Sequence, residues 1–140
     1  MKVSEVMSRD VMVARPQDSI RSVAQRMTQI DVGSLPVCDG ERLAGIVTDR
    51  DIVIRVVGEG RSFETPVAEV MTAGVQYCLE DDDLGDAADK MAQAQVRRLP
   101  VLDRDNRVVG VLALGDVALK ARDKTAGQTL EDISEPTRPA

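Results

Sequence analysis

The residues best suited to chemistry lie in segment 45–51, which reads Gly-Ile-Val-Thr-Asp-Arg-Asp. This pattern is typical of a short apolar strand that ends in a polar turn, with a helix beginning behind it. Thr48 supplies a hydroxyl and Asp51 a carboxylate, three residues apart at this junction. The start of a helix has free backbone N–H groups and the positive end of the helix dipole. The segment therefore predicts a turn that suits an anion.

The same pair of residues has a simpler interpretation. A Ser or Thr followed three residues later by an acid loosely fits a capping box, which would only start a helix and contribute about 1 kcal/mol. A weaker copy of the segment at 110–116 keeps the acid as Asp116 but has Ala113 in place of the hydroxyl. Because Ala113 removes any capping box while the acid remains, the second copy favours a binding role over a capping role.

The two segments belong to a tandem duplication. Sliding the sequence on itself by 64 positions gives 13 identities among the 35 pairs that begin at residues 3–37. Residues 35–37 and 99–101 both read Leu-Pro-Val. One extra residue in the turn 103–107 then moves the shift to 65. Each copy, at about 60 residues, is too small to be secure alone, so we expect two copies packed around a shared aliphatic core.

Each copy is predicted to run strand–helix–strand–strand–helix, which gives an α+β fold. In the first copy, residues 11–14 read as a short strand. A helix with its apolar stripe starting at Ile20 follows, and Asp18 or Ser19 is the expected N-cap. Residues 35–47 read as two strands joined by an Asp-Gly hairpin turn.

The composition excludes several classes of function. The 140 residues include no histidine, no Trp, one Phe and one Tyr. A His-based catalytic triad and a zinc site are therefore set aside. The formal net charge of −6 argues against a nucleic-acid-binding surface over the whole protein. Asp49 and Asp51 could resemble a catalytic acid pair, but no nucleophile, base or metal ligand accompanies them, so we expect no enzyme.

The sequence also bears on cellular location. It contains no apolar run of about 18 residues that could span a bilayer and no segment shaped like a signal peptide. Cys38 and Cys78 occupy non-equivalent positions in the two copies, which is poor evidence for a disulfide. We therefore expect a reduced, cytoplasmic protein without membrane contact.

The duplicated motifs resemble a pair of CBS domains, the regulatory module named after cystathionine β-synthase. The resemblance rests on the Val-Met-Ser/Thr openings at 6–8 and 70–72, the Leu-Pro-Val strands, and the Gly-apolar-apolar-Ser/Thr-x-x-Asp segments. It assigns residues 3–60 to a first CBS domain, 67–122 to a second, and 123–140 to a polar tail. The chain is similar to the small stand-alone bacterial CBS proteins.

The resemblance implies two clefts between the copies and a flat homodimer. It also implies binding of an adenosyl compound such as AMP, ADP, ATP, NAD or S-adenosylmethionine. By position, Thr48 would contact phosphate and Asp51 the ribose hydroxyls. Asp116 would be the ribose acceptor of a second, weaker site. The residues assigned to ligand binding are Val11, Val13, Leu35 and Pro36, which would form the base pocket beside Thr48 and Asp51, together with Arg98, Leu99, Pro100 and Asp116.

Charged runs in the second copy keep alternatives open. Arg98 stands where the first copy has Ser34, and in relatives an arginine at this place often reaches phosphate. It could equally pair with the acidic run 80–83 or remain solvated. The acidic run is more consistent with helix capping by Asp82 and Asp83 than with a cation site.

Together these features predict a non-catalytic sensor. It requires no cofactor and binds an adenine nucleotide as a regulatory ligand, which changes the shape of the dimer or its affinity for a regulated protein. A ligand-free scaffold or interaction module is the first alternative. Nucleic-acid binding is the second, and the acidic balance disfavours it.

Overall fold

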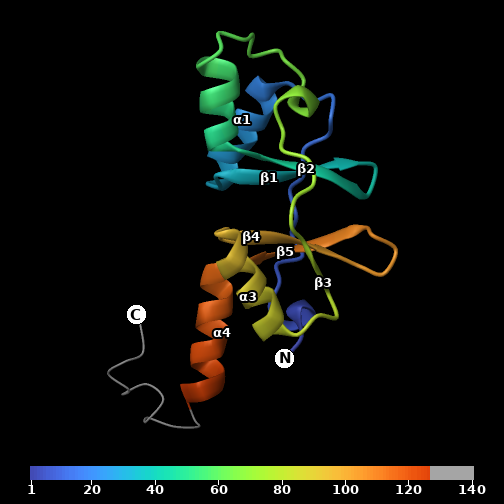
Figure 1. The fold of residues 1–140 in the computed structure, drawn as a ribbon, viewed down its shortest axis with the longest axis vertical. Coiled ribbons are helices and arrows are strands. Elements are labelled where there is room, and N and C mark those ends of the chain that lie inside the picture. The colour runs from blue at the N-terminus through green and yellow to red at the C-terminus, as the bar shows by residue number, and fades with distance from the viewer. Residues whose placement is uncertain (127–140) are drawn as a thin grey trace.

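The computed structural model describes residues 1–126, with side-chain surroundings to residue 120. It consists of two similar halves stacked so that their β-hairpins face each other and their helices lie outside (Figure 1). The mixed α+β fold predicted from the repeat is confirmed. None of the helices within the described range is long and apolar enough to cross a membrane.

The halves contain corresponding elements. The first half has α1 (Ile20–Ile30), β1 (Ser34–Asp39), β2 (Arg42–Thr48), α2 (Asp49–Ile52) and a π-helical turn (Val53–Val57) that continues α2. The second half has β3 (Cys78–Leu79), α3 (Leu84–Ala94), β4 (Arg98–Leu102), β5 (Val108–Ala113) and α4 (Leu114–Ala126). Short 3-10 turns, Val3–Glu5 and Val67–Glu69, open the two copies. Helix α4 passes the predicted start of the tail, and residues 127–140 lie outside the described part.

The predicted hairpins are present. Strand β1 pairs antiparallel with β2, and β4 pairs antiparallel with β5. The predicted strand at 11–14 is wrong, because only Ala14 of that segment pairs, in a parallel bridge to Val37. The reason lies just upstream, where Ser8 pairs with Val111 of the other half. The chain is still crossing between the halves there and reaches the first hairpin only at Ala14.

Side-chain caps fix where the long helices begin. In α1 the Ser22 N–H donates to the Ser19 hydroxyl over 3.1 Å, so Ser19 is the N-cap. In α3 the carboxylate of Asp83 accepts from the Gly85 N–H over 3.0 Å. The expected caps at Ser19 and Asp83 are therefore confirmed, and they fix the start of each helix in front of the Leu-Pro strand that follows it.

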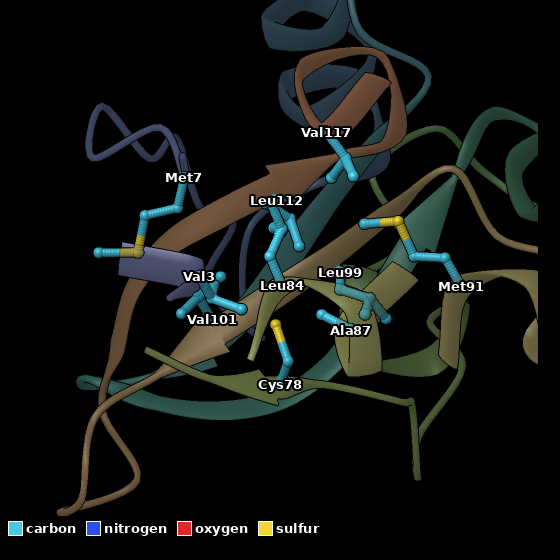
Figure 2. Close-up of a cluster of buried hydrophobic side chains, with 10 residues drawn as sticks. All are labelled: Val3, Met7, Cys78, Leu84, Ala87, Met91, Leu99, Val101, Leu112 and Val117. Atoms are coloured by element: carbon cyan, nitrogen blue, oxygen red, sulfur yellow. The ribbon is translucent and has the colours of Figure 1, made fainter. Parts of the chain in front are cut away.

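The aliphatic core is not shared, as the sequence had suggested, but divided into two clusters. Each cluster is completed by the opening segment of the other copy. Val3 and Met7 pack into the second half, where Figure 2 shows them among the side chains of Cys78 and its neighbours. Val67 and Val70 pack into the first half. The halves thus exchange their opening segments, and neither core is complete without the other copy.

A glycine in each hairpin permits this exchange. After leaving its turn, the chain pairs with the edge of a hairpin, and the N–H and C=O groups of Thr72 bond to those of Ile46 over 2.8–2.9 Å. A Cβ atom on Gly45 would lie 2.6 Å from the Thr72 carbonyl oxygen. A Cβ atom on Gly110 would lie 2.8 Å from the carbonyl oxygen of Ser8. The glycine that begins each Gly-apolar-apolar motif therefore allows the backbone of the crossing segment to approach the hairpin, and it does not contact either cleft.

Helix α2 and its π-helical continuation hold the exchanged segment. The Gly58 N–H donates to the Val53 carbonyl five residues earlier over 2.8 Å, as in a π-helix. The Arg55 guanidinium donates to the Val70 carbonyl over 2.8 Å and to the Met71 carbonyl over 3.2 Å. A charged side chain of the first copy thus satisfies two carbonyl groups at the opening of the second.

Candidate functional site

Two clefts lie between the stacked hairpins, and their lining residues correspond through the repeat. The Thr48 cleft, of about 380 Å³, contains Thr48 and Asp51. The Asp116 cleft, of about 250 Å³, contains Ala113 and Asp116 at the equivalent positions. Both clefts therefore place a helix-start carboxylate beside apolar side chains, as the duplicated motif predicted.

The apolar wall of the Thr48 cleft comes from the second copy. Val75, Leu99 and Pro100 line it opposite Thr48 and Asp51. The leucine and proline belong to β4, whereas the hydroxyl and carboxylate stand at the junction of β2 and α2. A ligand in this cleft would therefore contact both copies at once.

The predicted grouping of the base pocket is wrong. Val11, Leu35 and Pro36 line the Asp116 cleft and not the Thr48 cleft. The hairpins pack face to face, so each apolar wall faces the helix start of the other copy. The assignment carried over from the resemblance puts a wall and a carboxylate of one copy in one site, whereas the stacking pairs them across copies.

Val13 lines neither cleft. It borders a separate hollow near the hairpin tips, together with Cys38, Glu41 and Arg107. Side chains alternate along an extended chain, so Val11 and Val13 would share a face of a regular strand. Both side chains border this hollow, but only Val11 also reaches the Asp116 cleft.

The start of α2 is a reciprocal capping box. The Asp51 N–H donates to the Thr48 hydroxyl over 3.1 Å, and the Thr48 N–H donates to the Asp51 carboxylate over 3.0 Å. The Asp49 N–H donates to the Gly33 carbonyl over 2.9 Å, and the Arg50 N–H donates to the Asp49 carboxylate over 2.8 Å. All three N–H groups of the first turn are therefore occupied, and the prediction that this backbone turn suits an anion is wrong.

The capping bonds leave part of the hydrogen-bonding capacity of the Thr48 and Asp51 side chains unused. Only one oxygen of the Asp51 carboxylate, Oδ2, accepts the Thr48 N–H, and Oδ1 has no hydrogen bond to the described residues. A carboxylate oxygen can accept from a hydroxyl, and such charge-assisted bonds are strong. The Thr48 hydroxyl uses a lone pair in the cap and keeps its proton for donation. Capping and ligand binding are therefore compatible.

Arg98 is the cation of both clefts. It is the first residue of β4, pairs with Ala113 across the hairpin, and lines the Thr48 cleft and the Asp116 cleft. Within residues 1–120 it forms no ion pair. The acidic run bonds elsewhere, with Asp81 paired to Lys2 over 3.8 Å and to Arg104 over 3.2 Å. The alternative that Arg98 pairs with this run is not realised.

Sequence reasoning missed polar residues on the segments that follow the two opening turns. Ser8 and Asp10 line the Asp116 cleft, and Thr72 and Gln76 line the Thr48 cleft. The signal was present in the Val-Met-Ser/Thr openings, which were recognised as family markers but not as part of a site. Their position became apparent only with the exchange of the openings.

The two cysteines are buried free thiols. Burial raises the pKa of Cys38 above its ordinary value. Burial, with the nearby Asp82 charge, raises the pKa of Cys78 to about 11. Because the thiolate is the reactive form, neither side chain is suited to act as a nucleophile at neutral pH.

Comparisons with known proteins agree with this geometry. The family model of the CBS domain matches residues 3–58 and again residues 67–122. The chain belongs to the CBS domain family. The resemblance inferred from the duplicated motifs is therefore confirmed, and the two halves in Figure 1 are a CBS domain pair.

Individual relatives extend over nearly the whole pair. The chain is 40% identical to the CBS domain-containing protein YhcV of Bacillus subtilis (strain 168) over 133 residues, which cover 94% of each chain. It is similar to CBSX2 of Arabidopsis thaliana in complex with AMP, with a TM-score of 0.78 and 25% identity over 89% of this chain and 98% of that one. It is also similar to the CBS domain pair of MJ0100 in complex with 5′-methylthioadenosine and S-adenosyl-L-methionine, with a TM-score of 0.77, 26% identity and the same coverage.

Proposed function

We propose that this CBS pair is a non-catalytic sensor that binds an adenine nucleotide between its two copies. One observation carries the proposal: each cleft combines an apolar wall from one copy with a helix-start carboxylate from the other. An apolar slot suits a purine, and a carboxylate oxygen suits ribose hydroxyls. Solved CBS pairs with AMP and with 5′-methylthioadenosine support the same ligand class.

The Thr48 cleft is the proposed nucleotide site. Adenine packs against Val75, Leu99 and Pro100, and the ribose hydroxyls donate to Asp51. The phosphate group accepts from the Thr48 hydroxyl and the Arg98 guanidinium, because the backbone N–H groups of the first turn are already used. AMP, ATP and NAD all carry the adenosine and phosphate groups that this arrangement recognises.

Binding between two copies supplies a route to regulation. A nucleotide that contacts both halves stabilises the arrangement in which its contacts fit. It can shift an equilibrium only by the difference between its affinities for the two states. The proposed output is a change in the shape of the module and in its affinity for a regulated protein.

A cytoplasmic homodimer is part of the proposal. Val53 and Val57 in the π-helical turn are both 59% exposed, and Leu119 on α4 is 58% exposed. Apolar side chains exposed at helix surfaces are suited to burial against a second copy. Native mass spectrometry of the intact chain tests this point, and a monomer at micromolar concentration contradicts it.

Calorimetry with AMP, ATP, NAD and S-adenosylmethionine tests the nucleotide site. Asp51→Asn should abolish or strongly weaken the tightest site, whereas Asp116→Asn should leave it within a few-fold. A ligand at 100 times its Kd should add about 2.7 kcal/mol to the free energy of unfolding. If no adenosyl compound binds or shifts the melting temperature, the proposal fails and the ligand-free interaction module is favoured. Salt-dependent retention on DNA or RNA would instead favour nucleic-acid binding.

A further inference from the structure

The two clefts are equivalent in backbone but share a single cation. Arg98 lines both, whereas its counterpart Ser34 lines the Asp116 cleft alone and carries no charge. No other lysine or arginine within residues 1–120 lines either cleft. A single guanidinium therefore serves two sites.

The two clefts differ in their number of carboxylates. The Thr48 cleft contains one carboxylate, from Asp51, so that with Arg98 its charges balance. The Asp116 cleft contains two, from Asp10 and Asp116, because Gly74 occupies the position equivalent to Asp10 in the other cleft. Its charge is about −1 while Arg98 faces it and about −2 once Arg98 turns away.

Other groups in the Asp116 cleft do not compensate for the extra carboxylate. The hydroxyls of Ser8 and Ser34 are neutral donors. The N-terminus of α4 carries a partial charge of roughly +0.5, which is less than the full charge of one added carboxylate. Ala113 supplies no hydroxyl where the Thr48 cleft has one.

From this arrangement we infer that the clefts bind different classes of adenosine compound and are coupled through Arg98. A phosphate-bearing nucleotide in the Thr48 cleft engages the guanidinium. The Asp116 cleft then retains two carboxylates and accepts an adenosine compound that lacks phosphate and is uncharged or cationic. The inference rests on the proposed nucleotide binding and adds the ligand class and mutual regulation of the two clefts.

Because the two clefts share one cation, a phosphate bound in one cleft should lower the affinity of the other cleft for phosphate. A second phosphate-bearing ligand competes for Arg98, so it should bind roughly tenfold or more weakly than the first, within the usual range for coupled sites. Adenosine in the Asp116 cleft does not need the guanidinium, so it should bind beside AMP with little loss. By reciprocity, a phosphate forced into the Asp116 cleft weakens AMP in the Thr48 cleft by the same factor.

Calorimetric titration of the intact chain with AMP and with adenosine tests the inference in three proteins. In the unaltered chain we expect one strong AMP site, a second at least about tenfold weaker, and binding of adenosine to the AMP-loaded protein. Ser34→Arg gives the first copy the arginine of the second and should make the two AMP affinities converge. Arg98→Ser removes the cation from both clefts and should reduce the affinity for AMP towards that for adenosine.

The outcomes separate the two proposals. Two equal AMP sites in the unaltered chain, or no change in the affinity ratio on S34R, overturn the inference while leaving nucleotide binding intact. Failure of every adenosyl compound to bind overturns the proposed function itself. Circular dichroism checks that each variant is folded. If S34R does not fold, D10G is used instead, because it gives the Asp116 cleft the residue of the other copy and should narrow the ratio.

Discussion

The two copies are alike at many core positions and differ at several cleft positions. Positions that are identical in both copies are often core positions, as with the pairs Val3/Val67, Met27/Met91 and Leu35/Leu99, all buried. Cleft positions diverge, with Thr48 against Ala113 and Ser34 against Arg98. The two copies thus have the same fold, but their clefts carry different charges. Identical positions therefore include the cores and the common parts of the clefts, such as Asp51/Asp116, whereas the differing positions give each cleft its own charge and hydrogen bonding.

Removal of residues 1–7 should have the largest effect, and it should act on the second half. Val3 and Met7 would leave that core, at roughly 1.5–3 kcal/mol for each buried side chain, so its free energy of unfolding should fall by roughly 3–6 kcal/mol. The thiol of Cys78 lies in this core, whereas that of Cys38 lies in the first half. Mass spectrometry after thiol labelling should therefore show faster labelling of Cys78 and little change at Cys38. Equal acceleration at both would argue against exchanged openings.

Gly45→Ala tests the crossing of the chain. The new methyl group would meet the Thr72 carbonyl oxygen, which is backbone and cannot rotate away. We expect a loss of about 1–3 kcal/mol in urea denaturation, and the equivalent change Gly110→Ala should cost a similar amount. Gly115→Ala is the control, because no atom of the described residues lies within 4 Å of its Cβ position and alanine favours a helix by up to about 1 kcal/mol. Unchanged stability in G45A would contradict the close approach.

Asp18→Asn should lower the free energy of unfolding more than the equivalent change Asp82→Asn, and its cost should depend on pH. Burial raises the pKa of Asp18, but the Arg15 N–H and the Arg26 guanidinium outweigh it and hold the pKa below its ordinary value. The equivalent Asp82 keeps the backbone bond, accepting from the Leu79 N–H over 2.9 Å, but it has no cationic partner among residues 1–120, because Lys90 donates to the Tyr77 carbonyl over 2.7 Å. We expect D18N to cost about 1–2 kcal/mol at pH 7 and D82N to cost less.

The sign of this pH effect follows from the lowered pKa. The carboxylate stabilises the fold above its unfolded pKa of about 3.9 and loses that contribution as the pH falls through the folded value. Denaturation curves of the wild type and D18N should therefore converge in acid. A difference that persists unchanged at pH 2 would exclude the Asp18 charge as its source.

The smallest effect concerns the helix caps. Ala113→Thr should let the second copy form the reciprocal bonds seen between Thr48 and Asp51, with a gain of about 0.5–1 kcal/mol. Thr48→Ala should lose a similar amount. Melting temperatures measured without ligand test both changes. If A113T gives no gain while T48A gives a loss, the two helix starts differ in backbone as well as in side chain.

Much of the fold was readable from the repeat. The helical stripe after Ile20, the hairpin turn and the family motifs depend on local spacing, which sequence records directly. The strand at 11–14 failed because Ser8 and its neighbours are held by a distant hairpin edge. Long-range pairing of this kind leaves no periodic signal in the segment itself.

The site was predictable in its residues but not in their grouping. The hydroxyl and carboxylate at 48 and 51 are recognisable by type and spacing. Whether Leu35 or Leu99 faces Asp51 depends on how two hairpins stack, which one copy of the motif cannot reveal. The alternatives of cap and site were also not exclusive, because one carboxylate oxygen serves the cap and the other remains available.

The exchanged openings make the duplicated chain the smallest unit that closes both cores. A single copy could complete its core only by binding the opening segment of a second molecule, so its stability would depend on protein concentration. Joining the copies through residues 58–66 replaces that encounter with an intramolecular one, for which a short linker gives an effective concentration of about millimolar. The segments that follow the openings then run directly along the two clefts. A ligand in either cleft would therefore contact the chain directly after an exchanged opening segment.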